Sequence, residues 1–120
     1  MVSRSYNTFF ESVSITSTTA DAGANVIYTV PPNHDCELDF CMATNGSATH
    51  TISLQIYHSD DATYHHVLRA HSIAGNDSYR LVESDRIYLH AGDRVVAYKS
   101  GGTLDVTVSG KLYYNPVRGV

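Results

Sequence analysis

The sequence predicts an all-β protein, and three observations support this prediction. Apolar and polar residues alternate along much of the chain between Asn25 and Lys111, as in the run Leu104, Val106 and Val108 with polar residues between them. A period of two is that of strands with one buried face. Helical spacing is almost absent, and Gly-, Pro- and Asn-rich turns separate the segments. We therefore expect a single, jelly-roll-like β-sandwich of about eight short, mostly antiparallel strands.

The strands follow from these runs and from the turns between them. The turn at 20–23 ends the first, and Pro31 and Pro32 end the second because proline cannot donate to a ladder. Turns that contain glycine, at 45–47, 75–77, 91–93 and 101–102, separate the remaining strands. A polar loop at 59–62 connects the two strands of a hairpin. The expected strands are 13–18, 25–30, 35–44, 50–58, 64–70, 79–82, 86–89, 94–99 and 103–114.

The domain organisation follows from the same pattern. Residues 1–12 lack a clean period and are expected to form an N-terminal arm, 13–114 the β-sandwich domain, and 115–120 a C-terminal tail. The residues on the apolar faces are the expected core. They are Val26, Tyr28, Val30, Leu38, Phe40, Ile52, Leu54, Ile56, Val95, Leu104, Val106 and Val108.

The composition argues against some classes of binding partner and favours others. Charged residues make up 17% of the chain, and the net charge is −4. This balance argues against binding to nucleic acid, which needs a clustered basic surface. No apolar stretch approaches the length of a membrane span, and no signal-peptide pattern is present at the start, so we expect no membrane partner and synthesis in the cytosol. Nine tyrosines and only two lysines, Lys99 and Lys111, are typical of protein interfaces.

Two cysteines, Cys36 and Cys41, lie five residues apart. In one continuous strand this odd separation directs them to opposite faces, Cys36 with Leu38 and Phe40, and Cys41 with Asp39. We expect two free thiols, as in a reducing compartment.

Three segments together resemble a known family. They are Tyr28-Thr29-Val30-Pro31-Pro32-Asn33, Leu89-His90-Ala91-Gly92-Asp93-Arg94-Val95 and Leu104-Asp105-Val106-Thr107-Val108-Ser109-Gly110. Their order and spacing are similar to those of small β-sandwich structural proteins in tailed bacteriophages, although each motif is also ordinary turn and strand chemistry. The resemblance implies a virion structural protein without catalytic residues, with a head-decoration or tail-associated role.

Candidate chemical sites are few. One hairpin carries a group of polar residues: His58, Asp60, Asp61, His65 and His66. Three interpretations are open for this group, namely a metal site, a pH-sensitive interface and a simple exposed polar loop. Nucleophile-elbow, zinc-protease and phosphate-loop motifs are missing from the sequence, so we expect no enzyme, no cofactor and no metal. The main alternative function is carbohydrate binding on a platform of aromatic rings. Its candidate residues are Tyr57, Tyr64, Tyr79 and Tyr98, and the simpler interpretation is that these tyrosines only favour strand formation.

The two termini carry the candidate interface. Its residues are Tyr6, Phe9, Phe10, Tyr113, Tyr114, Pro116 and Val117. Exposed apolar groups on polar tails usually have a partner, so one terminus is expected to bind a neighbouring subunit in extended form at a sheet edge. The alternative is that Phe9 or Phe10 packs under the sandwich as part of the first strand.

These features lead to one functional hypothesis. The protein is expected to be a capsid decoration (cement) protein of a phage head, assembled in the host cytoplasm and located in the virion. Its partners would be the major capsid protein and its own copies, with a trimer favoured among cyclic homo-oligomers. A tail, neck or fibre-associated role, with or without binding to host-surface carbohydrate, is the alternative.

Overall fold

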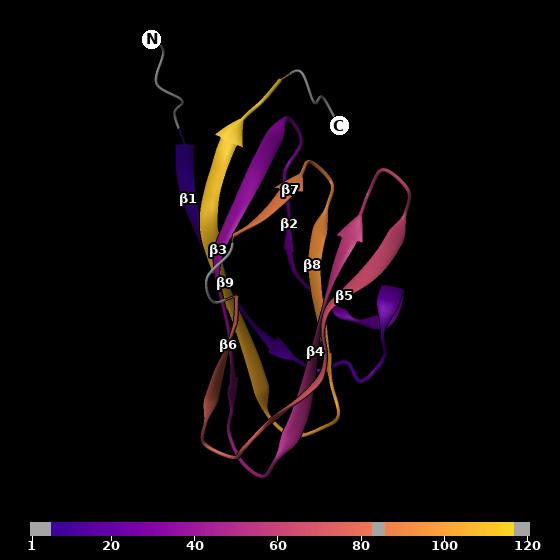
Figure 1. The fold of residues 1–120 in the computed structure, drawn as a ribbon, viewed down its shortest axis with the longest axis vertical. Helices are drawn as coiled ribbons and strands as arrows, with labels where there is room; N and C mark the ends of the chain where they lie inside the picture. Colours follow the sequence, from indigo (N-terminus) through magenta and orange to yellow (C-terminus); the bar gives the residue numbers. More distant parts are fainter. Residues whose placement is uncertain (1–5, 83–85, 117–120) are drawn as a thin grey trace.

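The computed structural model describes residues 6–82 and 86–116, and in this part of the chain the protein is a sandwich of two antiparallel sheets (Figure 1). The described sandwich is elongated, with extents of 51 × 28 × 20 Å. Its elements are β1 (Tyr6–Ile15), the 3-10 helix η1 (Asp21–Gly23), β2 (Asn25–Thr29), β3 (His34–Asn45), β4 (His50–His58), β5 (Thr63–Ile73), β6 (Ser78–Val82), β7 (Ile87–His90), β8 (Arg94–Lys99) and β9 (Leu104–Tyr114). No helix among the described residues is long and apolar enough to cross a membrane.

The strand order confirms the predicted β-sandwich. One sheet, here the first sheet, has the order β1-β9-β3-β6, and β7 also pairs with β3. The second sheet has the order β2-β8-β4-β5. Since β7 pairs with residues 35–38 of β3 and β6 with residues 41–44, β6 and β7 form two halves of one edge strand. With these halves counted as one, each sheet has four strands and the chain crosses repeatedly between the sheets, as in a jelly roll.

The core lies between the sheets and contains most of the residues predicted from the alternating pattern. Nine of the twelve are buried: Val30, Leu38, Ile52, Leu54, Ile56, Val95, Leu104, Val106 and Val108. The other three expectations are corrected: Val26 is exposed, and Tyr28 and Phe40 are only partly buried. Each of these misses lies beside an irregularity in strand pairing.

Two β-bulges explain these corrections. The pairing of β2 with β8 shifts between Val26 and Tyr28, and Ile27 is buried instead. The pairing of β3 with β9 shifts between Leu38 and Phe40, so Cys41 and Ala43 are buried. An extra residue reverses the face of every residue that follows. Cys36 and Cys41 therefore share the core face, contrary to the expected opposite faces, and both thiols are free, as predicted.

The first strand begins earlier than the sequence predicts. β1 begins at Tyr6, whereas the sequence places the start of the sandwich at Val13, so the part of the expected arm from Tyr6 to Ser12 belongs to the first sheet. The ring of Phe9 stacks on Tyr28 with centroids 4.2 Å apart and packs against the core, which is the alternative that the sequence left open. Pairing with β9 decides this placement, and such a long-range contact leaves no period in the local sequence.

The chain after β9 is also tied to the sandwich. The backbone N–H of Asn115 donates to the carbonyl of Asn33 at 2.6 Å, and its side-chain amide donates to Asp35 Oδ2 at 2.8 Å. The expected tail at 115–120 is thus anchored at its first residue. Residues 117–120 lie outside the described part of the chain.

Candidate functional site

The predicted interface residues are only partly brought together. Tyr6 and Tyr113 are directly opposite each other on β1 and β9, with ring centroids 5.8 Å apart, and Tyr114 lies beside the ring of His34 at 5.6 Å. Phe10 lies further along β1 and is 68% exposed, whereas Phe9 faces the core. Pro116 is exposed, and Val117 lies outside the described residues. The candidate interface therefore centres on β1 and the end of β9.

β1 is an unusually regular edge strand. It pairs with β9 through ten consecutive residue pairs without a register shift, and no described strand pairs with its other side. In an antiparallel pair, alternate residues direct their N–H and C=O groups away from the partner. Proteins usually protect such an edge with lysine, proline, a bulge or a very short strand. β1 contains no lysine or proline, and its only charged residue is Glu11.

The other edges carry such protection. β5 has two register shifts against β4, and Ala70 within it has a φ of 47°, a left-handed conformation that is strained for a residue with a Cβ. β2 is short and bulged, and the edge beyond β3 is divided between the short strands β6 and β7. Among the described strands, β1 alone combines length and regular pairing at an edge.

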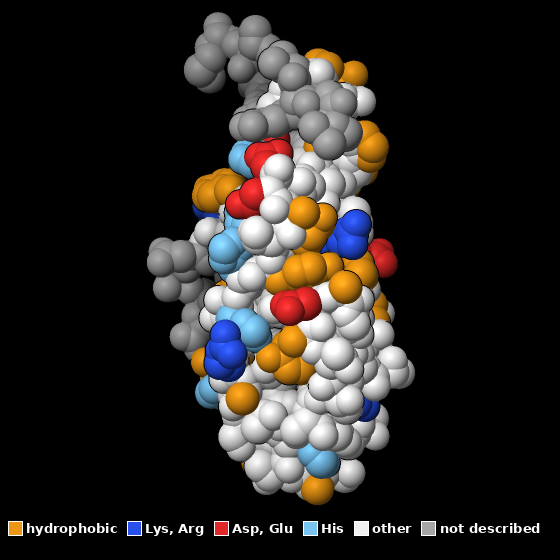
Figure 2. All heavy atoms as spheres, turned by 90° about the vertical axis from the view of Figure 1, so that its right-hand side faces the viewer, with side chains coloured by type: hydrophobic (Ala, Val, Ile, Leu, Met, Phe, Trp, Pro, Cys, Tyr) orange, Lys and Arg blue, Asp and Glu red, His pale blue; other side chains and the backbone are white. Residues whose placement is uncertain are grey.

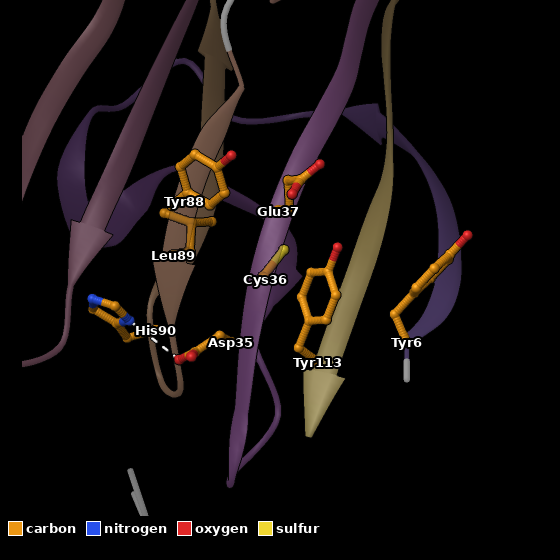
Figure 3. Close-up of a pocket in the computed structure, with 8 residues that line it drawn as sticks. All are labelled: Tyr6, Asp35, Cys36, Glu37, Tyr88, Leu89, His90 and Tyr113. Atoms are coloured by element: carbon orange, nitrogen blue, oxygen red, sulfur yellow. Dashed lines mark hydrogen bonds and ion pairs between the residues drawn. The ribbon is translucent and has the colours of Figure 1, made fainter. Parts of the chain in front are cut away.

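A groove lies on the outer face of the first sheet, above the beginning of β3. Its volume is about 440 Å³. Figure 3 shows Tyr88 and His90 of β7 on one side, Tyr6 and Tyr113 on the other, and Glu37 between them. Strand register produces this arrangement, because Asp35 is opposite both His90 and Tyr113, and Glu37 is opposite both Tyr88 and Lys111.

The carboxylates of the groove are held by fixed partners. Glu37 Oε1 lies 3.2 Å from Arg86 Nε and 3.8 Å from Lys111 Nζ, and the Glu37 side chain is only 10% exposed. The carboxylate of Asp35 lies 3.3 Å from His90 Nδ1 and accepts the Asn115 amide. Burial of a carboxylate is costly unless it is paired, and here each one has a partner. The carboxylates on the floor of the groove are therefore held in place by their partners.

The predicted histidine cluster is only partly assembled. The rings of His58 and His65 are in edge contact with centroids 5.2 Å apart, but His66 instead hydrogen-bonds the hydroxyl of Tyr98 at 2.8 Å. Within the described ranges, no group of three or more His, Cys, Asp or Glu side chains is placed to hold a metal ion. The pKa of Asp61 lies below its ordinary value, chiefly because the Thr63 hydroxyl donates a hydrogen bond to it.

The four tyrosines considered as a sugar platform are separated. Tyr57 and Tyr64 lie side by side on the second sheet, with centroids 4.7 Å apart, and Tyr98 is on β8 beside His66. Tyr79 is on β6 of the first sheet and stacks on His71. Figure 2, which faces the side of β5 and η1, shows hydrophobic side chains in small separate groups among polar atoms. A continuous platform does not form there.

The groove was not found by sequence reasoning. The sequence does contain one signal: Asp35 and Glu37 alternate within one strand, and Tyr88 and His90 within another, so each pair shares a face. The sequence contains no sign that these two strands pair, because about forty residues and the three described strands β4, β5 and β6 separate them along the chain.

A scan against models of known protein families and a search of curated proteins found no match to this chain.

Proposed function

We propose that this protein is a non-enzymatic structural subunit of a tailed-bacteriophage particle, most simply a decoration protein that stabilises the head. The three motifs at residues 28–33, 89–95 and 104–110 and their resemblance to small phage β-sandwich proteins support this proposal, as does the sandwich architecture. A tail- or neck-associated position is the alternative, because the same small sandwich suits either location.

The observation that carries the assembly role is the regular edge of β1. An extended segment of a neighbouring subunit adds to β1 as a further strand, gaining main-chain hydrogen bonds along the edge. Phe10, exposed beside this edge, contributes apolar contact area. The partners are another copy of this chain, in a cyclic trimer, and the major capsid protein or a tail protein of the same virion. Assembly takes place in the host cytoplasm.

Many modest contacts are sufficient for this role. Each copy on a particle is held by several neighbours at once, so weak individual contacts combine into a stable shell through a high effective concentration. A reactive centre is not required, and the proposal assigns none to the described residues.

A matched pair of lysine substitutions tests the proposal. Phe10→Lys places a charge at the β1 edge, and Val67→Lys makes the same change at an exposed apolar residue on the β5 edge. Circular dichroism should show both variants folded. Phe10→Lys should reduce incorporation into particles and break the oligomer in light scattering, whereas Val67→Lys should behave like the unmodified protein.

Electron microscopy of particles that carry the protein provides the direct measurement. We expect strand density alongside β1 in each copy. Contacts made through β5 instead, or normal incorporation of Phe10→Lys, would contradict the assembly mechanism. A purified particle without this protein would contradict the virion role itself.

A further inference from the structure

We propose that the groove above β3 binds a single pyranose ring of a neutral glycan. This inference goes beyond the assembly role, because it concerns the outer face of the first sheet and not its β1 edge. It follows from the two tyrosine walls, the carboxylates fixed on the floor of the groove, and the countercharges already present beside Glu37.

The walls have the composition and spacing of a sugar site. Tyr88, which is 66% exposed, stands on β7, and Tyr113 stands on β9, with β3 between them (Figure 3). Strands two positions apart in a sheet are separated by about 10 Å. Tyr88 is opposite Glu37 and Tyr113 is opposite Asp35, so the two side chains flank β3 diagonally. The groove volume of about 440 Å³ is in the range of small-molecule sites and is sufficient for one ring. Tyrosine offers both an apolar face for the C–H groups of a sugar and a hydroxyl for its polar groups.

The floor supplies hydrogen-bond acceptors that are already in position. Arg86 and Lys111 both approach Oε1 of Glu37, and a carboxylate has more acceptor positions than these two contacts use. Asp35 is fixed in the same way by His90 and Asn115. Side chains that are fixed before binding lose little conformational entropy when a ligand arrives.

Charge distinguishes a neutral sugar from a cationic ligand. Two tyrosine walls above two carboxylates would also suit an ammonium or guanidinium group. Here, however, Glu37 already faces two permanent cations and Asp35 faces a histidine. A ligand cation would therefore find the charge of Glu37 already countered, whereas a neutral polyol needs only hydrogen-bond partners.

Two-dimensional amide NMR of the full chain tests the proposal. The probes are the methyl glycosides of glucose, galactose, mannose, rhamnose and N-acetylglucosamine, each at tens of millimolar, with arginine and choline as cationic comparators. At least one glycoside should shift the amides of residues 35–37, 87–90 and 113 in a saturable manner. The cations should leave these amides unchanged.

A matched pair of tyrosines locates the site. Tyr88→Ala removes one wall and should weaken binding about tenfold, which corresponds to the loss of one aromatic contact. Tyr114→Ala removes a side chain of similar exposure, 64%, that lies outside the groove and should leave the affinity unchanged. Absence of shifts with every glycoside, equal affinity of both variants, or binding of the cations alone would overturn the proposal. Particle incorporation is a separate readout, so failure here leaves the assembly role intact.

Discussion

β1 and β5 are edge strands of similar length on opposite sheets, and they present their edges in different ways. β1 runs beside β9 in unbroken register, with Glu11 as its only charged residue. β5 contains Arg69 and three histidines, and its pairing with β4 shifts twice. Bulges and charged side chains hinder the addition of another strand, whereas a regular edge permits it. Within the described sandwich, one edge is therefore protected and the other is open, which is what directional assembly through a single edge requires.

The largest expected effect is a loss of folding stability at high pH, caused by the two buried thiols of β3 in the sheet that carries β1. Burial raises the pKa of Cys36 and Cys41 from the ordinary 9.0 to about 12, and Asp39 and Glu37 add to the shift of Cys36. The folded protein thus holds these protons more tightly than the unfolded chain does, so the free energy of unfolding falls as the pH rises from about 9 to 12. The loss should be on the order of 4 kcal/mol for each thiol.

Denaturant titrations across this pH range measure that loss. Cys41→Ala removes one of the two buried thiols and should reduce the slope of the free energy of unfolding against pH. Hydrogen exchange over the same pH range shows which strands lose stability. If β1 and β5 unfold as one cooperative unit, the amides of both strands should lose protection at the same pH. An unchanged slope in Cys41→Ala would contradict the assigned role of burial.

A smaller effect is expected from Gly110→Ala, which acts within the first sheet. Gly110 lies between Phe9 of β1 and Leu38 of β3, and an added Cβ would collide with the carbonyl oxygen of Glu37 and press on the Phe9 ring. Backbone atoms cannot move aside easily, so the substitution should cost about 3 kcal/mol. Hydrogen exchange should increase in β1 more than in β5, and equal increases in both would show that the edges are not independent.

The smallest expected changes in folding stability come from replacing one serine near each of the two edges. Ser53 Oγ is buried and accepts the backbone N–H of Ala70, the strained residue in the β5 bulge, at 2.8 Å. Ser53→Ala leaves this N–H unpaired and should cost about 1–2 kcal/mol. Ser12→Ala on β1 removes only an exposed hydroxyl contact with Thr107 and should cost less than about 0.5 kcal/mol. Chemical denaturation measures both, and equal losses would mean that the bulge does not depend on Ser53.

The sequence by itself determined the fold class and the placement of most strands. Alternation predicted the buried faces of β4, β8 and β9 correctly, because the side-chain period of a strand is a local property. Turn residues predicted most strand ends for the same reason, since the conformational preferences of proline and glycine need no distant partner.

Tertiary structure decided what depends on pairing between distant segments. The bulges near Ile27 and Asp39 reverse the local phase, so Val26 is exposed and Cys41 enters the core. Pairing with β9 turns Tyr6–Ser12 into strand, although these residues have no amphipathic period. The groove likewise requires β7 and β9 to flank β3, which brings Tyr88 and His90 to one side of β3 and Tyr113 to the other. Register between strands is set by the summed packing of the whole sandwich, and for that reason a local pattern in the chain does not encode it.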